Sequence, residues 1–416
     1  MSNDNFTEVT SQSWFSRLGN AFKGIIVGII MVVIAFPVLF WNEGRAVKRY
    51  KTLKEGGGAV ISVSADKVDA ANQGKLVHLT GMATTEETLT DTSFGVSSRA
   101  IKLMRIAEMY QWQQECESEE KKKLGGGTET VTTYTYSKAW SDNLISSSQF
   151  KKPEGHQNPA QMAYQSNEMV AGKVTIGAFT LSPSQVRMMR DYSLVTLGPD
   201  FNLPDSLKDQ TLLSSNTIYL GKNSVSPQVG DIRISFKEVK PMNISLVANQ
   251  ENNTFEPFHA KAGGTIELLE SGTHSAEAMF QQARKSNTIL TWVLRGVGFV
   301  VMLIGFQLIL APLSIFADVL PILGSIVGSG TGIIAGMIAG ILSCLTIAIA
   351  WIVYRPLIGI IMLILSGGIG FFLFTKLRKT PPVLADPAAA VPPPPSEDVP
   401  TAPDATPPPL NRNSKE

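Results

Sequence analysis

Long stretches without a charged residue, at both ends of the chain, constrain the fold of this sequence most. Residues 24–41, GIIVGIIMVVIAFPVLFW, form the first stretch and contain no charged side chain. About 18 apolar residues in a helix are enough to cross the hydrocarbon core of a bilayer. No small-residue cleavage pattern follows Trp41, and the stretch is longer than the apolar part of a usual signal peptide. A retained transmembrane helix is therefore predicted.

Three more transmembrane helices are predicted towards the carboxyl end. Their ranges are 296–316, 332–354 and 357–374. The chain stays uncharged throughout 319–354, which for a straight helix rising about 1.5 Å per residue exceeds one membrane thickness. Because Pro321 and closely spaced glycines fall in this stretch, a glycine-rich break or re-entrant segment is predicted at 319–331.

The two ends of the chain have different expected structures. Residues 1–23 are predicted to be an N-terminal tail with an interfacial amphipathic helix, because Trp14, Leu18 and Phe22 fall on one helical face. Residues 380–416 are rich in proline and poor in large apolar side chains, so they are predicted to be a disordered proline-rich tail.

Residues 42–294 have the mixed composition of a soluble fold. Segments rich in β-branched and aromatic residues, separated by turn formers, predict strands at 75–80, 174–181, 217–220, 231–239 and 244–248, and a long hairpin of 101–116 with 129–140. Helices are predicted at 158–169 and 275–285. The predicted fold class is a membrane protein with four transmembrane helices and a large β-dominated α+β extramembrane domain inserted between the first helix and the second.

Five glycines spaced four residues apart place a smooth strip along the third predicted helix and the segment before it. They are Gly324, Gly328, Gly332, Gly336 and Gly340. Such a strip lets another helix backbone approach closely. Packing within the helix bundle, a seam between copies of the chain, and a pore lining all fit this pattern. No predicted span carries an acidic or basic residue of the kind that marks an ion route.

The sequence contains no recognisable catalytic or metal-binding motif. The histidines are scattered, and none is spaced for metal binding with another His, Cys or carboxylate. A formal net charge of +1, without a concentrated basic segment, argues against a nucleic-acid partner. Neither a nucleophile elbow nor a phosphate loop occurs. The chain is therefore expected not to be an enzyme and to use no cofactor or metal.

Several short strings follow one another along nearly the whole chain apart from its tails. They include Asn42-Glu-Gly-Arg-Ala46, Gly74-Lys-Leu-Val-His78, Glu108-Met-Tyr-Gln-Trp112, Val229-Gly-Asp231, Thr291-Trp292 and Tyr354-Arg-Pro-Leu357. Together these strings resemble the LUMA (transmembrane protein forty-three) family. The resemblance implies four spans, termini in the cytosol, and the large domain in the lumen or periplasm. It also implies an organiser of the endoplasmic reticulum and inner nuclear membrane that self-associates and holds partner proteins, without established catalytic residues.

The orientation in the membrane is the point on which the residues and the resemblance differ. Basic residues near the spans are more numerous on the side of the inserted domain, which by the positive-inside rule would place that domain in the cytoplasm. A domain of this length is exempt from the rule, so we follow the resemblance. Because the glycine strip and the proline-rich tail depart from animal members, a bacterial plasma (inner) membrane remains an alternative to the endoplasmic reticulum and inner nuclear membrane.

Charged residues gather where the domain is predicted to meet the membrane. They are Glu43, Arg45, Arg295 and Arg355. We predict that Glu43 pairs with one of these arginines and so fixes the domain to the helices. The alternative is that the arginines anchor in lipid headgroups.

These features together predict a non-enzymatic integral membrane scaffold or organiser. We expect it to self-associate as a homo-oligomer and to hold partner proteins or lipids at the membrane. Its expected partners are copies of itself, membrane lipids and other membrane proteins, and nucleic acid is not among them. The alternative function is that of a channel or transport accessory subunit.

Overall fold

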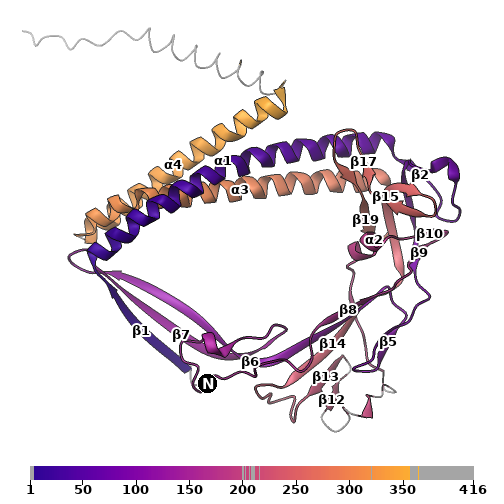
Figure 1. The fold of residues 1–416 in the computed structure, drawn as a ribbon, viewed down its shortest axis with the longest axis horizontal. Coiled ribbons are helices and arrows are strands. Elements are labelled where there is room, and N and C mark those ends of the chain that lie inside the picture. Colours follow the sequence, from indigo (N-terminus) through magenta and orange to yellow (C-terminus); the bar gives the residue numbers. More distant parts are fainter. Residues whose placement is uncertain are drawn as a thin grey trace, which may run out of the picture. The chain divides into compact units, whose positions relative to one another are not determined.

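A computed structural model of the chain describes residues 4–198, 201, 203–205, 207, 211–214, 216–319, 321–356 and 364 (Figure 1). The fourth predicted span, 357–374, lies outside the described residues apart from Ile364, and the predicted disordered tail, 380–416, lies outside them entirely. The described chain consists of long helices and a β-rich domain, which is inserted between the first long helix and the other two.

The apolar stretches lie in three helices, α1 (Trp14–Ala59), α3 (Ala276–Ala317) and α4 (Pro321–Tyr354). Ser13 precedes α1 and Ser275 precedes α3, and the hydroxyl of each accepts a hydrogen bond from a backbone N–H of the first turn. Within the described residues, these three helices are long and apolar enough to cross a membrane. The structure therefore supports three spans, and the prediction of four is not supported.

The connection from α3 to α4 differs from the predicted break at 319–331. A turn at Asp318 and Val319 follows α3, and α4 then continues as one helix to Tyr354. Proline suits the first turn of a helix, where its missing N–H would have no helical partner. In an apolar environment each backbone amide needs a partner within its own segment, which favours helix even in a glycine-rich stretch. The segments predicted as 319–331 and 332–354 thus share one helix.

Helices α1 and α3 run alongside each other in opposite directions, and glycines mark their closest approach (Figure 1). A Cβ atom on Gly28 would lie 2.5 Å from the carbonyl oxygen of Gly305, and one on Gly298 would lie 2.4 Å from the side chain of Leu39. A larger residue would therefore force the two helices apart. The buried residues around this contact come from all three helices and are Ala35, Leu39, Met302 and Ala339.

The inserted domain contains two large sheets. The first has the strand order β1 (Asp4–Gln12), β7 (Thr128–Ser141), β6 (Lys102–Lys122), β14 (Ile232–Val239), β13 (Thr217–Leu220) and β12 (Thr211–Ser214), with β8 (Asn167–Val170) beside β6 and β11 (Ser193–Leu194) beside β14. The second has the order β10 (Phe179–Thr180), β9 (Thr175–Ile176), β3 (Leu76–Thr84), β15 (Met242–Glu251) and β16 (Thr254–Glu256), with β19 (Leu268–Ser271) beside β15 and β2 (Ile61–Ser62) beside β3.

Smaller elements complete the domain. They are the hairpin of β4 (Leu89–Asp91) and β5 (Val96–Ser98), the hairpin of β17 (Phe258–His259) and β18 (Thr265–Ile266), the short helix α2 (Pro183–Met188), and the 3₁₀ turns Ala70–Asn72 and Ser147–Gln149. The neighbouring strands of the two large sheets are antiparallel, except that β2 runs parallel to β3.

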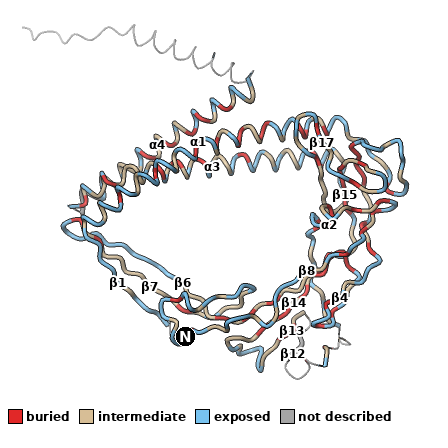
Figure 2. The backbone as a smooth tube through the Cα atoms, viewed as in Figure 1, coloured by how far each residue is buried: buried red, intermediate tan, exposed pale blue. Residues whose placement is uncertain are grey.

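Each large sheet has its own hydrophobic core (Figure 2). Along β14 burial alternates from residue to residue, as expected for a strand with one face turned inward. A third buried cluster joins the second sheet to the ends of α1 and α3 that extend beyond the apolar stretches. Its buried members are Leu53, Leu76, Val247, Ile266, Met279 and Phe280. The two helices therefore continue directly into the core of the domain.

The predicted strands are confirmed, since β3, β9 with β10, β13, β14 and β15 fall on the predicted segments and β6 with β7 forms the predicted hairpin. The predicted helix at 275–285 is the start of α3. The strand β1 was not predicted. It lies within the predicted N-terminal tail and pairs with β7 from Asp4 opposite Tyr136 to Gln12 opposite Thr128.

The predicted helix at 158–169 is wrong. The Asn158 side chain accepts a hydrogen bond from the backbone N–H of Trp112 at 2.7 Å and donates to the backbone carbonyls of Trp112 and Ile145 at 2.8 and 3.1 Å. These contacts hold the segment in an irregular path along β6, and β8 then adds to the edge of the same strand. Hydrogen bonds to a distant strand thus override the local helical pattern.

Candidate functional site at the junction of the helices and the domain

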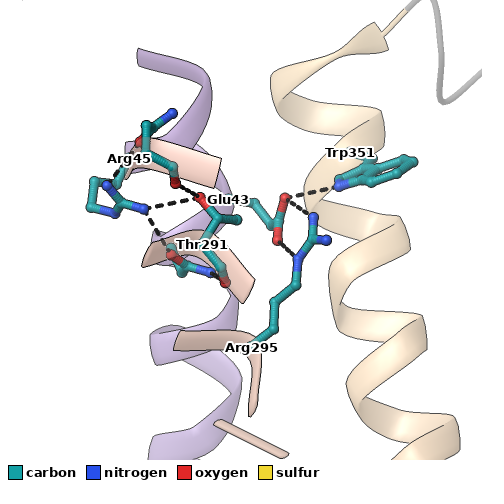
Figure 3. A network of polar contacts seen from close by, with 7 residues as sticks. Glu43, Arg45, Thr291, Arg295 and Trp351 are labelled. Atoms are coloured by element: carbon teal, nitrogen blue, oxygen red, sulfur yellow. Dashed lines mark hydrogen bonds and ion pairs between the residues drawn. The ribbon is translucent and has the colours of Figure 1, made fainter. Parts of the chain in front are cut away.

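The carboxylate of Glu43 is the centre of a polar cluster between the three long helices. Glu43 is 1% exposed and lies on α1, just beyond the apolar stretch. Arg295 of α3 donates to it twice, from Nε to Oε1 at 2.6 Å and from Nη2 to Oε2 at 2.9 Å. Trp351 of α4 donates from Nε1 to Oε2 at 2.8 Å (Figure 3). One buried carboxylate thus connects all three helices.

Aromatic rings surround the guanidinium of Arg295. Its Cζ lies 4.7 Å from the ring centroid of Trp292 and 5.7 Å from that of Trp351. The Cζ of Arg355 lies 5.9 Å from the same Trp351 ring. Cations over indole faces gain electrostatic attraction, and the rings also keep water away from the ion pair. The pair is therefore both oriented and shielded.

Arg45, two residues further along α1 than Glu43, makes a second connection between α1 and α3. Its Nη1 donates to Oδ1 of Asn287 at 3.1 Å, and its Nη2 donates to Oγ1 of Thr291 at 3.1 Å and to Oδ1 of Asn42 at 3.3 Å (Figure 3). All three acceptors are neutral. Arg45 makes no ion pair with any of the residues that the structure describes, and its Nε is buried without a hydrogen-bond partner among them.

A cavity of about 470 Å³ opens beside this second connection. Its lining comes from α1, α2, α3 and the segment around β19: Arg45, Arg49, Met188, Glu267, Leu268, Leu269, Glu270, Gln282, Ala283, Ser286, Asn287 and Leu290. Arg49 lies well outside the apolar stretch of α1, and its Nη1 donates to the carbonyl of Thr265 at 2.6 Å. Burial and then the positive charge of Arg45 lower the pKa of the Arg49 guanidinium.

The structure brings together some of the sequence-predicted site residues and separates others. The predicted ion pair of Glu43 with an arginine is present, and Arg295 is the partner. Arg45 contacts neutral side chains, and Arg355 packs on Trp351. The contributions of Trp351, Asn42, Thr291 and Asn287 were not predicted. The available signal was the position of these polar and aromatic residues at the ends of apolar stretches.

The glycine strip of α4 makes mostly ordinary contacts in the described structure. A Cβ atom on Gly328 would lie 3.0 Å from Oγ of Ser314, whereas one on Gly336 or Gly340 would meet α3 side chains at 3.9–4.0 Å. A Cβ atom on Gly332 would meet nothing within 4 Å. The side-chain surroundings of Gly324 are not among those that the structure describes. Tighter contacts lie between α1 and α3 at Gly28, Gly298 and Gly305, and between α1 and α4 at Gly44, where a Cβ atom would lie 2.6 Å from the ring of Tyr354.

A second polar cluster lies at the other end of the helices. Asp318, fully buried after the end of α3, accepts from Nη2 of Arg17 at 2.6 Å and from Nζ of Lys122 at 2.6 Å. Lys122 is the last residue of β6, so the tip of the β6–β7 hairpin contacts the start of α1 and the end of α3. About 26 residues of helix, roughly 39 Å, separate Arg17 from Glu43 along α1.

The contact of the hairpin with Asp318 and a bilayer around the helices exclude each other. The domain continues from the end of α1 beyond Glu43, so its hairpin would have to pass the level of the apolar stretches to reach Asp318. The hairpin carries acidic residues along β6, including Glu115, Glu117 and Glu119, and such a strand cannot pass through hydrocarbon. A bilayer in this position therefore requires the hairpin to leave Asp318, with Arg17 remaining as its partner. It also requires β1 to leave β7, because β1 precedes α1 and its Gln12 lies opposite Thr128 beside the hairpin tip.

Comparison with known proteins supports the resemblance of the sequence strings. The family model described as Transmembrane protein 43 matches residues 109–356. Transmembrane protein 43 of Rattus norvegicus is 33% identical over 83% of this chain and 88% of its own length, and that of Homo sapiens is 33% identical over 84% and 89%. The chain belongs to the Transmembrane protein 43 family. A homolog from Drosophila melanogaster is 29% identical over 84% of this chain and 94% of its own length.

Membership of the Transmembrane protein 43 family makes this chain a membrane protein with three candidate spans. No solved structure matches it. The part matched by the Transmembrane protein 43 family model contains Arg295, Trp351 and Arg355, whereas Glu43 precedes it. Within the described residues, no group of three or more His, Cys, Asp or Glu side chains is placed to hold a metal ion.

Proposed function

We propose that the protein is a non-enzymatic integral membrane scaffold, which self-associates and holds partner proteins or lipids at the membrane surface. The observation that carries the proposal is the buried Glu43 cluster, in which one carboxylate binds α1, α3 and α4 at the point where the helices leave their apolar stretches. A scaffold needs a fixed geometry between its membrane anchor and its binding domain, and this cluster supports such a geometry.

The helices extend this rigid connection into the domain. Beyond the apolar stretch ending at residue 41, α1 continues to Ala59, about 27 Å further at 1.5 Å per residue. Leu53 of this extension and Phe280 of α3 pack with Val247 of the second sheet in one buried cluster. A domain attached through a shared core moves with its helices, because close-packed interiors resist deformation.

We further propose that the amino terminus faces the cytoplasm and that the domain lies in the lumen or the periplasm. Three spans then place Tyr354, at the end of α4, on the side of the domain. The length of the inserted domain supports this orientation, since long domains are translocated despite flanking basic residues. The membrane would be that of the endoplasmic reticulum and inner nucleus in a eukaryote, or the plasma membrane in a bacterium.

The test measures the oligomeric mass of the full-length protein in lipid nanodiscs, and ion flux in liposomes that contain the same preparation. A mass corresponding to more than one copy, without flux above that of empty liposomes, is the expected result. A single copy per nanodisc at every protein concentration would overturn self-association. Flux that substitutions in α1, α3 or α4 abolish would instead support the channel or transport alternative.

A further inference from the structure

The cavity beside Arg45 combines cationic and apolar walls at the level where a bilayer surface would lie. On one side Arg45 and Arg49 are four residues apart, so they project from the same face of α1. Leu290 of α3 lines the cavity and belongs to an exposed apolar face that continues with Val293 and Val297, and the exposed Trp292 lies on another side of the same helix. Exposed tryptophan next to an apolar stretch is typical of the interface between membrane and water.

We propose that this cavity binds a membrane phospholipid, with its phosphate on Arg45 and Arg49 and its acyl chains along the exposed apolar face of α3. The proposal deepens the lipid-binding part of the proposed function. Neither arginine makes an ion pair with a residue in the described part of the chain. Both guanidinium groups therefore carry charge that a phosphodiester can neutralise, and planar guanidinium groups match phosphate oxygens in pairs.

The buried Nε of Arg45 is a second indication of a missing partner. It has no hydrogen-bond acceptor among the described residues, whereas the two terminal nitrogens of the same guanidinium donate to Asn42, Asn287 and Thr291. A buried donor without an acceptor is costly, because it has lost its hydrogen bond to water and gained none in exchange. A phosphate oxygen of a bound ligand can supply that acceptor when the Arg45 guanidinium turns its Nε towards the cavity.

The acidic residues of the lining limit which headgroup fits. Glu267 accepts hydrogen bonds from Ser184 at 3.2 Å and from Gln185 at 3.0 Å, and Glu270 also lines the cavity. Two carboxylates near the phosphate site repel a headgroup with additional negative charge and attract an ammonium group. The preferred ligand is therefore a zwitterionic phospholipid with a primary amine, such as phosphatidylethanolamine.

Binding can be measured by titrating the detergent-purified full-length protein with fluorescent phosphatidylethanolamine. Arg49→Gln removes one cationic ligand and, among the described residues, the hydrogen bond to the carbonyl of Thr265. Ser286→Trp fills the cavity from an exposed position on α3 and leaves both arginines in place. Each should weaken binding by about tenfold or more, since a charge-assisted contact or the space for the headgroup is lost. Lys51→Gln removes an equivalent charge from the exposed face of α1 and should leave the Kd within about twofold.

Three outcomes would overturn the proposal: equal binding by the wild type and both cavity variants, equal weakening by Lys51→Gln, or tighter binding of phosphatidylglycerol than of phosphatidylethanolamine. Water-soluble glycerophosphoethanolamine distinguishes a lipid from a free phosphate ester. If it binds as tightly as the lipid, the acyl chains contribute nothing and the assignment to a membrane lipid is wrong. The oligomeric mass of the same variants is measured separately, so a failure of self-association and a failure of this lipid site are distinguishable.

Discussion

Arg295 and Glu43 meet through two parallel hydrogen bonds of 2.6 and 2.9 Å, with the carboxylate almost completely excluded from solvent. The two residues are 252 positions apart in the sequence, and every strand in the described part of the chain except β1 lies between them. The pair therefore connects α1 to α3 next to the domain and fixes the relative position of the two helices where both leave their apolar stretches. Trp351 adds α4 to the same carboxylate.

Arg295→Gln should strongly destabilise the protein, because it leaves the Glu43 carboxylate buried without its cation. Removing one partner of a buried ion pair typically costs about 3–5 kcal/mol. The thermal unfolding midpoint of the protein in detergent should fall by several degrees, and adding Glu43→Gln should recover part of the loss because the uncompensated charge is then gone.

A second bidentate pair provides the matched control for this experiment. Arg233 donates to Glu108 at 2.6 and 2.7 Å, across β14 and β6, with side chains that are 38% and 25% exposed. Arg233→Gln removes the same geometry from a solvated site and should cost about 1 kcal/mol or less. Equal loss of stability in the two variants would show that the burial of Glu43 does not increase the cost of removing its cation.

Gly28→Ala should separate α1 from α3. The added methyl group would lie 2.5 Å from the carbonyl oxygen of Gly305, which is a backbone atom and cannot turn aside. Overpacking of this kind costs about 1–3 kcal/mol. The measurement is the thermal unfolding midpoint. Gly332→Ala adds the same methyl where nothing lies within 4 Å, and it should leave that midpoint unchanged. A drop for Gly332→Ala alone would indicate that α4 packs through the glycine strip against another chain.

The extent to which the sequence predicts this structure depends on how local each feature is. The apolar stretches and the strands were predictable because hydrophobic length and β-branched composition act within one element. A pair of Glu43 with one of the three junction arginines was also predictable, since charges at the ends of neighbouring spans have few other partners, but the sequence did not distinguish Arg295 from Arg45 and Arg355. The contact of Trp351 was not, because it depends on the rotation of α4 about its axis.

Glycine spacing shows the same limit. The regular strip from Gly324 to Gly340 was the conspicuous pattern, but the closest backbone approach occurs at Gly28 and Gly305, which belong to no repeat. A repeat places residues on one face of a helix without determining which face meets a neighbour. The strand β1 and the irregular path at Asn158 likewise depend on distant partners, β7 and Trp112, which local patterns do not encode.

The attachment of β1 to β7 should weaken in acid. Lys151 donates to Glu8 at 2.7 Å, and this hydrogen bond holds the pKa of the Glu8 carboxyl below its usual value. A lowered carboxyl pKa contributes stability that is present above the unfolded pKa of about 4 and is lost as the pH falls through the lowered value. Amide hydrogen exchange of residues 4–12 in the detergent-solubilised protein, where no bilayer separates β1 from β7, should therefore accelerate at acid pH after correction for the intrinsic pH effect.

Lys151→Gln should remove most of that acid-dependent change, because Glu8 then has no cation to lower its pKa. The adjacent Lys152→Gln changes the same charge but leaves the Glu8 contact in place, so it should behave as the wild type. The pairing of His156 with Asp4, at 2.8 Å, also holds β1 and is intact in both variants. If Lys151→Gln retains the full acid dependence, Glu8 is not its source.

The contact between the hairpin tip and the helix ends should be absent when a bilayer surrounds the helices. A protein with Cys116→Ser and Cys344→Ala, and with Lys122→Cys and Asp318→Cys, can be treated with a short bismaleimide cross-linker in intact membranes and after solubilisation in detergent. Cross-linking within one chain is expected in detergent, where Lys122 can reach Asp318, and not in the bilayer, because the acidic hairpin cannot pass through hydrocarbon.

The control pair is Lys122→Cys with Thr128→Cys, two positions that face each other across the hairpin. This pair should cross-link in both environments and so reports that the reagent reached the site. Efficient cross-linking of the first pair within one chain in intact membranes would mean that lipid does not surround α1 and α3 as continuous spans, and the proposed arrangement in the membrane would have to be abandoned.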